Sequence, residues 1–183
     1  MERILITGAA GFIGHHVVEY FLKNTEYSLV LLDRLDVSGN LNRLSEVLRP
    51  EDRSRVSFVW HDLKAPINEY VGKAIGKVEY IFHLAASTHV DRSILYPMEF
   101  VMDNVVGTAN MLDYARANPP KLFINFSTDE VFGTALTGSV HAESDRHAPS
   151  NPYAATKSAA HYLGVSYFHT YGLPIITTYT MNS

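Results

Sequence analysis

The chain has 183 residues, 46% of them apolar, with 15 Lys and Arg against 19 Asp and Glu and no cysteine. This length fits one domain with a substantial core, and the formal net charge of −4 gives no general electrostatic reason to bind nucleic acid or anionic lipid. The lack of cysteine excludes a disulfide scaffold, a thiolate nucleophile and a zinc site built on sulfur.

Short apolar runs alternate with longer helical patterns along the chain. The apolar runs predict strands over Ile4–Ile6, Leu29–Leu32, Val56–Trp60, Tyr80–Leu84, Leu122–Phe126 and Ile175–Thr178. The helical patterns predict helices over Phe12–Lys23, Leu41–Leu48, Ile67–Ile75, Met98–Ala117 and Pro152–Tyr171. A loop is predicted over Gly133–Ser150.

No run approaches the roughly 20 apolar residues that span a bilayer, and no secretory signal is evident. We therefore expect a cytoplasmic protein with no membrane or nucleic-acid partner.

The predicted strands are apolar throughout, which is typical of a parallel sheet buried on both faces. Their alternation with helices indicates an α/β fold with an open, doubly wound parallel sheet. Ligands of such sheets bind beyond the carboxyl ends of the strands. The residues that follow each strand are therefore the candidates for a functional site.

The first strand leads into its helix through a glycine-rich turn, Thr7–Gly14, with glycine at Gly8, Gly11 and Gly14. Glycine permits a tight turn and close approach of a pyrophosphate to the backbone, and the helix start offers free N–H groups. Asp33 ends the second strand, where a carboxylate can accept hydrogen bonds from ribose hydroxyls and repel a 2′-phosphate. Arg34 beside it weakens that repulsion. The pattern predicts a dinucleotide site that prefers NAD.

Two further strand ends carry candidate cofactor contacts. Asp62 and Leu63 follow the third strand, where a carboxylate can accept a hydrogen bond from the adenine amino group; an ordinary exposed loop is an equal alternative. Leu84, Ala85 and Ala86 follow the fourth strand, and the two small alanine side chains would let a cofactor lie against the backbone. Tight packing of a strand against a helix explains them equally well.

The fifth predicted strand is followed by Ser127, Thr128, Asp129 and Glu130. This position is on the ligand-facing edge of the sheet, although an ordinary polar loop is an open alternative. Two adjacent carboxylates there can act as an acid and a base if their environments differ.

Tyr153 and Lys157 are four residues apart in the last predicted helix, so they share one face of it. A nearby ammonium group would stabilise the phenolate and lower the pKa of the tyrosine, giving a base for an alcohol proton. The spacing is common by chance. Pro152 fits the first turn of this helix. The nine histidines are scattered without ligand spacing, so we expect no metal site.

Together these segments resemble the extended short-chain dehydrogenase/reductase superfamily: TGAAGFIG from Thr7, Asp33, HLAA from His83, Ser127-Thr128 and YAATK from Tyr153. THVDRSI from Thr88, NVVGT from Asn104 and STDEVFG from Ser127 are similar to the nucleotide-sugar 4,6-dehydratases, and most similar to the dTDP-glucose 4,6-dehydratase family. The resemblance implies NAD as cofactor and a nucleotide-diphosphate sugar as substrate. The implied cofactor contacts are Gly8, Gly11, Phe12, Ile13, Gly14, Asp33, Arg34, Asp62, Leu63, Leu84, Ala85, Ala86, Tyr153 and Lys157.

The resemblance also implies catalytic roles. Tyr153 would take the proton of the sugar 4-hydroxyl while hydride passes from C4 to NAD, with Lys157 holding the nicotinamide ribose and Thr128 bonding the 4-oxygen. Glu130 would then remove the C5 proton while Asp129 protonates the departing 6-hydroxyl, and hydride returns to C6. The implied substrate contacts are Thr88, Thr128, Asp129 and Glu130.

The resemblance covers only part of the family's usual length of roughly 300 residues or more. It therefore implies that residues 1–183 are a Rossmann-like NAD-binding domain whose substrate domain is largely absent, and we expect a fragment that is inactive alone or nearly so. It also implies a homodimer, formed through the helices at Met98–Ala117 and Pro152–Tyr171. Ser87 departs from the pattern, because relatives commonly carry Glu there.

Two alternatives stay open at this point. A 4-epimerase or decarboxylase of the same superfamily needs Tyr153 and Lys157 but not the acidic pair. A truncated module that binds NAD without turnover would act through protein contacts only.

Overall fold

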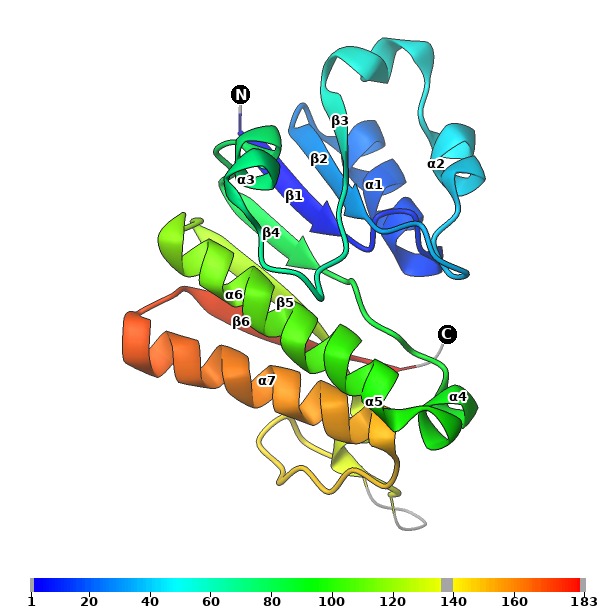
Figure 1. Ribbon diagram of the computed structural model, residues 1–183, viewed down its shortest axis with the longest axis vertical. Helices are drawn as coiled ribbons and strands as arrows, with labels where there is room; N and C mark the ends of the chain where they lie inside the picture. The colour runs from blue at the N-terminus through cyan, green and yellow to red at the C-terminus, as the bar shows by residue number, and fades with distance from the viewer. Residues whose placement is uncertain (1, 136–139, 182–183) are drawn as a thin grey trace.

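The computed structural model describes residues 2–135 and 140–181, which form a six-stranded parallel sheet flanked by helices (Figure 1). The strand order is β3-β2-β1-β4-β5-β6, and every neighbouring pair is parallel. The strands are β1 (Arg3–Thr7), β2 (Ser28–Asp33), β3 (Val56–Trp60), β4 (Tyr80–His83), β5 (Leu122–Thr128) and β6 (Ile175–Thr180). This order places the reversal of winding between β1 and β4, where ligands of doubly wound sheets bind.

Helices cover both faces of the sheet (Figure 1). They are α1 (Phe12–Asn24), α2 (Leu41–Val47), α3 (Glu69–Ile75), α4 (Val90–Leu95), α5 (Pro97–Phe100), α6 (Gly107–Ala117) and α7 (Pro152–Tyr171). Two 3₁₀ turns, η1 (Pro50–Ser54) and η3 (Asp129–Phe132), and one π-helical segment, η2 (Val101–Val106), complete the described elements. None of the described helices is long and apolar enough to cross a membrane.

Alternate residues of the central strands face two separate cores. One side of β1 places Leu5 against side chains of α3 and α6, among them Ile75 and Met111. The other side places Ile4 and Ile6 against α1 and α2. The strands are thus buried on both faces, as their continuous apolar sequence predicts.

The predicted doubly wound parallel sheet is confirmed, and the differences lie in the connecting segments. The helix predicted over Met98–Ala117 is wrong as one regular helix, because η2 interrupts it with π-helical hydrogen bonding. Strand β5 continues through Thr128, so Ser127 and Thr128 are its last residues rather than a following loop. The predicted loop has no helix or strand over residues 133–135 and 140–151, and residues 136–139 lie outside the described part.

The β1–α1 turn requires glycine, because the neighbouring backbone leaves no room for a Cβ atom. Gly8 has a φ of +68°, and a Cβ on it would lie 2.8 Å from the backbone nitrogen of Ala85 at the end of β4. A Cβ on Gly14, inside the first turn of α1, would lie 2.0 Å from the carbonyl oxygen of Gly8. Neither neighbour can move without shifting backbone, so these glycines fix how closely α1 and β4 approach the turn.

We expect Gly14→Ala to lower the free energy of unfolding by about 1–3 kcal/mol, because the added methyl overlaps backbone that cannot retreat. Urea denaturation followed by circular dichroism measures the change. Gly72→Ala is the matched control in α3, since the nearest atom to its added Cβ is 3.7 Å away; it should be neutral or stabilising by up to about 1 kcal/mol. Equal stability of Gly14→Ala and the parent chain would contradict this account of the turn.

Candidate active site

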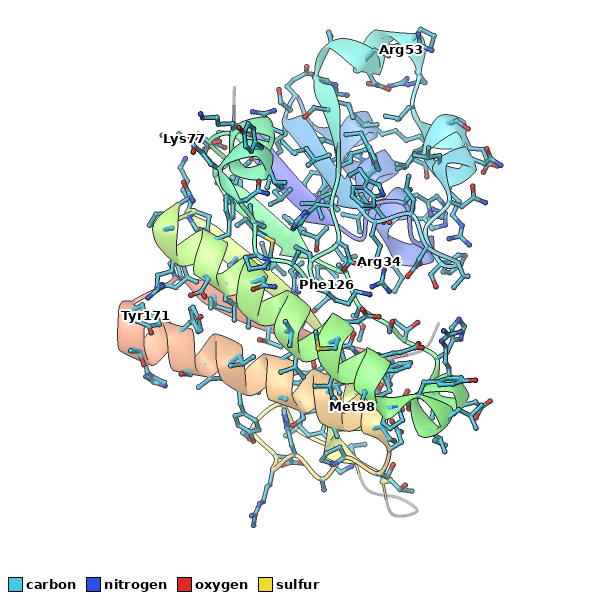
Figure 2. All side chains as sticks on the ribbon, in the orientation of Figure 1. Arg34, Arg53, Lys77, Met98, Phe126 and Tyr171 are labelled. Carbon is cyan, nitrogen blue, oxygen red and sulfur yellow. The ribbon has the colours of Figure 1, made fainter. Side chains whose placement is uncertain are left out.

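A cleft opens at the carboxyl-terminal edge of the sheet, between the glycine turn and the ends of β2, β3 and β4. Eight of the predicted cofactor residues line it: Gly8, Gly11, Asp33, Arg34, Asp62, Leu63, Ala85 and Ala86. Figure 2 shows Arg34 at this edge of the sheet. The structure therefore brings together residues that are up to 78 positions apart in the sequence.

Asp33 is buried, and backbone groups fix its carboxylate. One oxygen accepts a hydrogen bond from the backbone N–H of Ala10 at 2.9 Å, and the other accepts from the N–H of Leu35 at 2.8 Å. A carboxylate has about four acceptor positions, so both oxygens can still accept hydroxyl groups from a ligand in the cleft. The end of β2 thus holds a negative charge in a fixed orientation.

Arg34 forms ion pairs with carboxylates from two other segments. Its Nη1 and Nη2 donate to the two carboxylate oxygens of Asp103 at 2.5 and 2.8 Å, and its Nε donates to Asp36 at 2.7 Å. The neighbouring acidic groups raise the pKa of Arg34 above its ordinary value, with Asp103 the largest cause. Asp103 also accepts a hydrogen bond from the Ser87 hydroxyl at 2.6 Å. This network forms one wall of the cleft.

His83 at the end of β4 is a buried, neutral link between β1 and α6. Its Nδ1 lies 2.8 Å from the Thr7 hydroxyl and its Nε2 lies 3.0 Å from the Thr108 hydroxyl. Burial, with a smaller contribution from the charge of Lys157, lowers the pKa of His83 to about 3. The neutral imidazole contacts both hydroxyl groups without gaining a proton. His83 therefore supports the backbone under the cleft and carries no charge there.

Asn104 connects the cleft to α7. Its Oδ1 accepts from the backbone N–H of Ser87 at 2.7 Å, while its Nδ2 donates to the Ser87 carbonyl at 2.9 Å and to the Thr156 hydroxyl at 3.0 Å. The side chain is 1% exposed, so these bonds are shielded from water. The segment after β4 and the helix that carries Tyr153 are thereby held at a fixed separation.

A second group of predicted residues meets where β5 ends. Tyr153 is buried, and its pKa responds to a hydrogen bond with Thr128 and to the charges of Glu130 and Asp129. The Thr128 hydroxyl also accepts from the backbone N–H of Glu130 at 3.3 Å, which caps η3. The carboxylate of Glu130 accepts from the Asn151 side chain at 3.1 Å, just before α7 begins. The two acidic residues therefore lie close enough to Tyr153 for their charges to raise the pKa of its phenol.

The expected lowering of the Tyr153 pKa by Lys157 is wrong for this structure. Burial raises the pKa of Tyr153, and the two nearby carboxylates raise it further, while only the Thr128 hydrogen bond lowers it. Lys157 is 5% exposed and donates from Nζ to the carbonyl of Phe126 at 2.5 Å; Figure 2 shows Phe126 near the centre of the sheet edge. Burial lowers the pKa of Lys157 to about 8.

Several predicted residues lie outside the walls of the cleft. Phe12 and Ile13 are exposed at the start of α1, and Thr88 is exposed between β4 and α4. Gly14 lies beneath the turn, where it permits helix packing, and Leu84 packs against the core shared with α1. Among the residues that the structure describes, no group of three or more His, Asp or Glu side chains is arranged to hold a metal ion.

Three site residues were not predicted as functional. Asp103 and Asn104 lie in η2; the NVVGT segment used for the family resemblance begins at Asn104 and does not include Asp103. Asn151 precedes Pro152, and its Oδ1 accepts from the N–H of Ala154 at 2.8 Å. An Asn-Pro pair before a helical pattern is a recognisable helix start, so this capping residue could have been identified from sequence.

The fold and the side chains together define a Rossmann-like α/β protein of the short-chain dehydrogenase/reductase class. Residues 5–183 match the family described as GDP-mannose 4,6 dehydratase, and the chain belongs to this family. It is 38% identical to a dTDP-glucose 4,6-dehydratase of Neisseria meningitidis, over the whole of this chain and 54% of that protein.

Solved structures include both dehydratases and epimerases. The dTDP-glucose 4,6-dehydratase DesIV of Streptomyces venezuelae, solved with NAD and TYD bound, superposes with a TM-score of 0.88 at 35% identity, covering 97% of this chain and 55% of that one. The UDP-glucose 4-epimerase of Brucella ovis, solved with NAD, gives a TM-score of 0.84 at 27% identity, covering 100% of this chain and 52% of that one. The chain thus spans about half the length of these relatives.

The buried ammonium of Lys157 makes stability depend on pH. Its pKa of about 8 lies below the ordinary 10.5, so the unfolded chain binds the proton more tightly and the folded chain is disfavoured below pH 8. As pH rises from 8 to 10.5, the unfolding free energy of the parent should increase relative to Lys157→Met by up to about 3 kcal/mol. Chemical denaturation at several pH values measures this difference.

Lys23→Met is the control, because Lys23 is an exposed lysine paired with Glu19 on α1. Its stability curve should run parallel to that of the parent over pH 8–10. A parallel curve for Lys157→Met would show that burial does not lower this pKa.

Proposed function

We propose that this chain binds NAD in the cleft and supplies the acid–base side chains for 4,6-dehydration of a nucleotide-diphosphate sugar. NAD fits the donor set: the glycine turn leaves room for a diphosphate, the first N–H groups of α1 are free to bind it, and Asp33 can accept ribose hydroxyls. Asp62 and Leu63 would contact the adenine. The NAD-bound structures of relatives support this assignment.

The observation that carries the proposal is the placement of Thr128, Asp129 and Glu130 beside Tyr153 at the end of β5. A phenol suits removal of an alcohol proton, and two carboxylates suit removal and donation of protons in an elimination. The two carboxylates have different partners: Thr128 donates to Asp129 at 3.3 Å, and Asn151 donates to Glu130. Different surroundings are what separate an acid from a base.

In the proposed sequence, Tyr153 accepts the proton of the sugar 4-hydroxyl, while Thr128 holds the 4-oxygen. NAD, when bound, supplies reversible acceptance of hydride. With C4 oxidised to a ketone, the C5 proton becomes acidic and Glu130 removes it. Asp129 donates a proton to the 6-hydroxyl, which leaves as water, and the C5–C6 double bond forms. Reduction at C6 and return of a proton to C5 give the 4-keto-6-deoxy sugar.

Lys157 has two roles in this proposal. Its stem lies on the face of α7 that carries Tyr153, and its ammonium is held by the Phe126 carbonyl on β5. A ribose hydroxyl of bound NAD would be a second acceptor for this group, because an ammonium has three donors. Because burial lowers its pKa to about 8, a larger fraction of Lys157 than of an exposed lysine is neutral near pH 8 and able to accept a proton.

Residues 1–183 act in this proposal as one NAD-binding domain. The substrate class follows from the relatives, of which the chain matches about half the length. Binding of the nucleotide-diphosphate end would then depend on residues outside this chain. Since remote binding energy positions the reacting carbon, we expect turnover by these residues alone to be low.

A 4-epimerase is the second candidate, favoured by the epimerase structures that superpose well on this chain. Epimerisation conserves the mass of the substrate, while dehydration releases one water. Mass spectrometry of dTDP-glucose and UDP-glucose, incubated with NAD and the longest expressed form of the chain, separates the two. A product of unchanged mass with inverted C4 would refute dehydration.

We expect Asp129→Asn combined with Glu130→Gln to reduce dehydration at least 100-fold, because both proton-transfer groups are lost. NAD affinity should stay within about twofold of the parent, since neither residue lines the cofactor cleft. Steady-state product formation and calorimetric NAD titration are the two measurements.

The matched control is Glu19→Gln combined with Glu69→Gln, which neutralises two acidic residues in exposed helical ion pairs. This control should retain the parental rate. Dehydration at the parental rate by the Asp129/Glu130 variant would show that the carboxylates have been assigned wrongly.

We also propose a homodimer through α5–η2 and α7. Apolar side chains are exposed on these elements, including Met102 at 38% and Tyr162 at 52%, and Figure 2 labels Met98, an exposed residue of α5. A two-fold axis would bury the same patch on both copies.

Sedimentation velocity should show a dimer for the parent and a shift toward monomer for Tyr162→Glu, because a charge would replace a ring that the proposed interface buries. Tyr70→Glu, at an exposed site on α3, should leave the dimer intact. A monomeric parent at micromolar concentration, or an unchanged dimer in Tyr162→Glu, would count against this interface.

A further inference from the structure

Arg34 occupies a position that normally affects cofactor choice. It directly follows Asp33 at the end of β2, and an arginine close to the ribose is the residue that accommodates the 2′-phosphate of NADP in Rossmann folds. A free guanidinium here would bind a phosphate through two parallel hydrogen bonds. The carboxylate of Asp33 would then favour NAD, whereas the charge of Arg34 would favour NADP.

The structure shows that all three nitrogens of the Arg34 guanidinium already bond to carboxylates. Asp103 accepts from both Nη atoms in a bidentate pair, and Asp36 accepts from Nε and lies 2.5 Å from Nη2. Asp62 is a third carboxylate, 3.6 Å from Nη1. The guanidinium side chain is 25% exposed and that of Asp103 is 9% exposed, so the bidentate pair is partly shielded from solvent and from screening by salt.

The net charge of the cleft also disfavours binding of a 2′-phosphate. Its walls carry four carboxylates (Asp33, Asp36, Asp62 and Asp103) and two cations (Arg34 and Lys64), which gives a formal charge of −2. Lys64 is also paired, at 3.2 Å from Asp62 and 4.0 Å from Asp103. Each of the two cations that line the cleft is therefore already paired with a carboxylate. Neither is free to bind a phosphate dianion.

We propose that Asp103 and Asp36 are specificity-determining residues: they hold the Arg34 guanidinium so that it cannot bind a 2′-phosphate, and the cleft selects NAD over NADP. This inference rests on the proposed NAD binding. It assigns a role to Asp103, which reaches the cleft from η2, 69 residues away from Arg34 in the sequence. Asp33 repels the phosphate, and the two other carboxylates remove the group that would attract it.

The test is the ratio of the dissociation constants for NADP and NAD, which differ only by the 2′-phosphate. Isothermal titration calorimetry gives both constants for the parent and for Asp103→Asn, which keeps the shape of the side chain but loses its charge. We expect the ratio to fall at least tenfold in Asp103→Asn, mainly through tighter NADP binding. The same direction, with a smaller change, is expected for Asp36→Asn, which alters an exposed loop and tests the proposal even if Asp103→Asn folds poorly.

A second arm separates release of Arg34 from simple loss of negative charge. In the Asp103→Asn background, Arg34→Met should abolish the gain in NADP affinity. Glu69→Gln on α3 removes an equal charge from an exposed pair with Lys73 and should not change the ratio.

The outcomes are distinct. An unchanged ratio in both Asp103→Asn and Asp36→Asn, or a gain that survives Arg34→Met, would overturn the assignment. Absence of NAD binding by the parent would instead refute the proposed function itself.

Trp60, the single tryptophan, donates from its indole N–H to the Arg34 carbonyl at 2.9 Å, so its fluorescence offers an independent readout of binding.

Discussion

The hydrogen bonds of Asn104 hold the two parts of the site together. The cofactor cleft is built on β1, β2 and β4, whereas the phenol and the acidic pair belong to β5, η3 and α7. Asn104 bonds both backbone groups of Ser87 at the cleft and the hydroxyl of Thr156 on α7. Because a buried amide left without partners is costly, this connection constrains the distance between the two parts more strongly than apolar contacts alone.

The charge state of each side chain in the site depends on its hydrogen-bond partners and its burial, and not only on how many charged residues are present. Arg34 is surrounded by carboxylates, Lys157 is buried against a backbone carbonyl, and His83 is kept neutral between two hydroxyl groups. Tyr153 stays protonated more readily than a free phenol because burial raises its pKa. The cations of the cleft are thus paired with carboxylates, while Tyr153 and His83 are held in their neutral forms by burial.

The sequence predicts most of the fold and the positions of the principal side chains, for local reasons. The glycine turn, Asp33 and the Tyr153–Lys157 pair follow from spacing relative to strands and helices. The Tyr153 pKa was predicted in the wrong direction, because it depends on burial, which spacing does not reveal. Asp103 was missed because helical periodicity does not show where hydrogen bonding changes to the π pattern, nor which distant arginine a helix side chain will meet.

The π-helical segment has a consequence for chains of different length. An α-helix advances about 100° per residue, and the i→i+5 bonding of η2 accommodates one residue more than regular α-helical bonding would. Removing a single residue between Val101 and Val106 would restore regular α-helical bonding with α5 and α6 near their present orientation, but it would remove the widened turn that carries Asp103 and Asn104. Asp103 and Asn104 could not then both reach their partners. In a comparison with a related chain, a one-residue gap at this place would thus mark a differently built wall of the cleft.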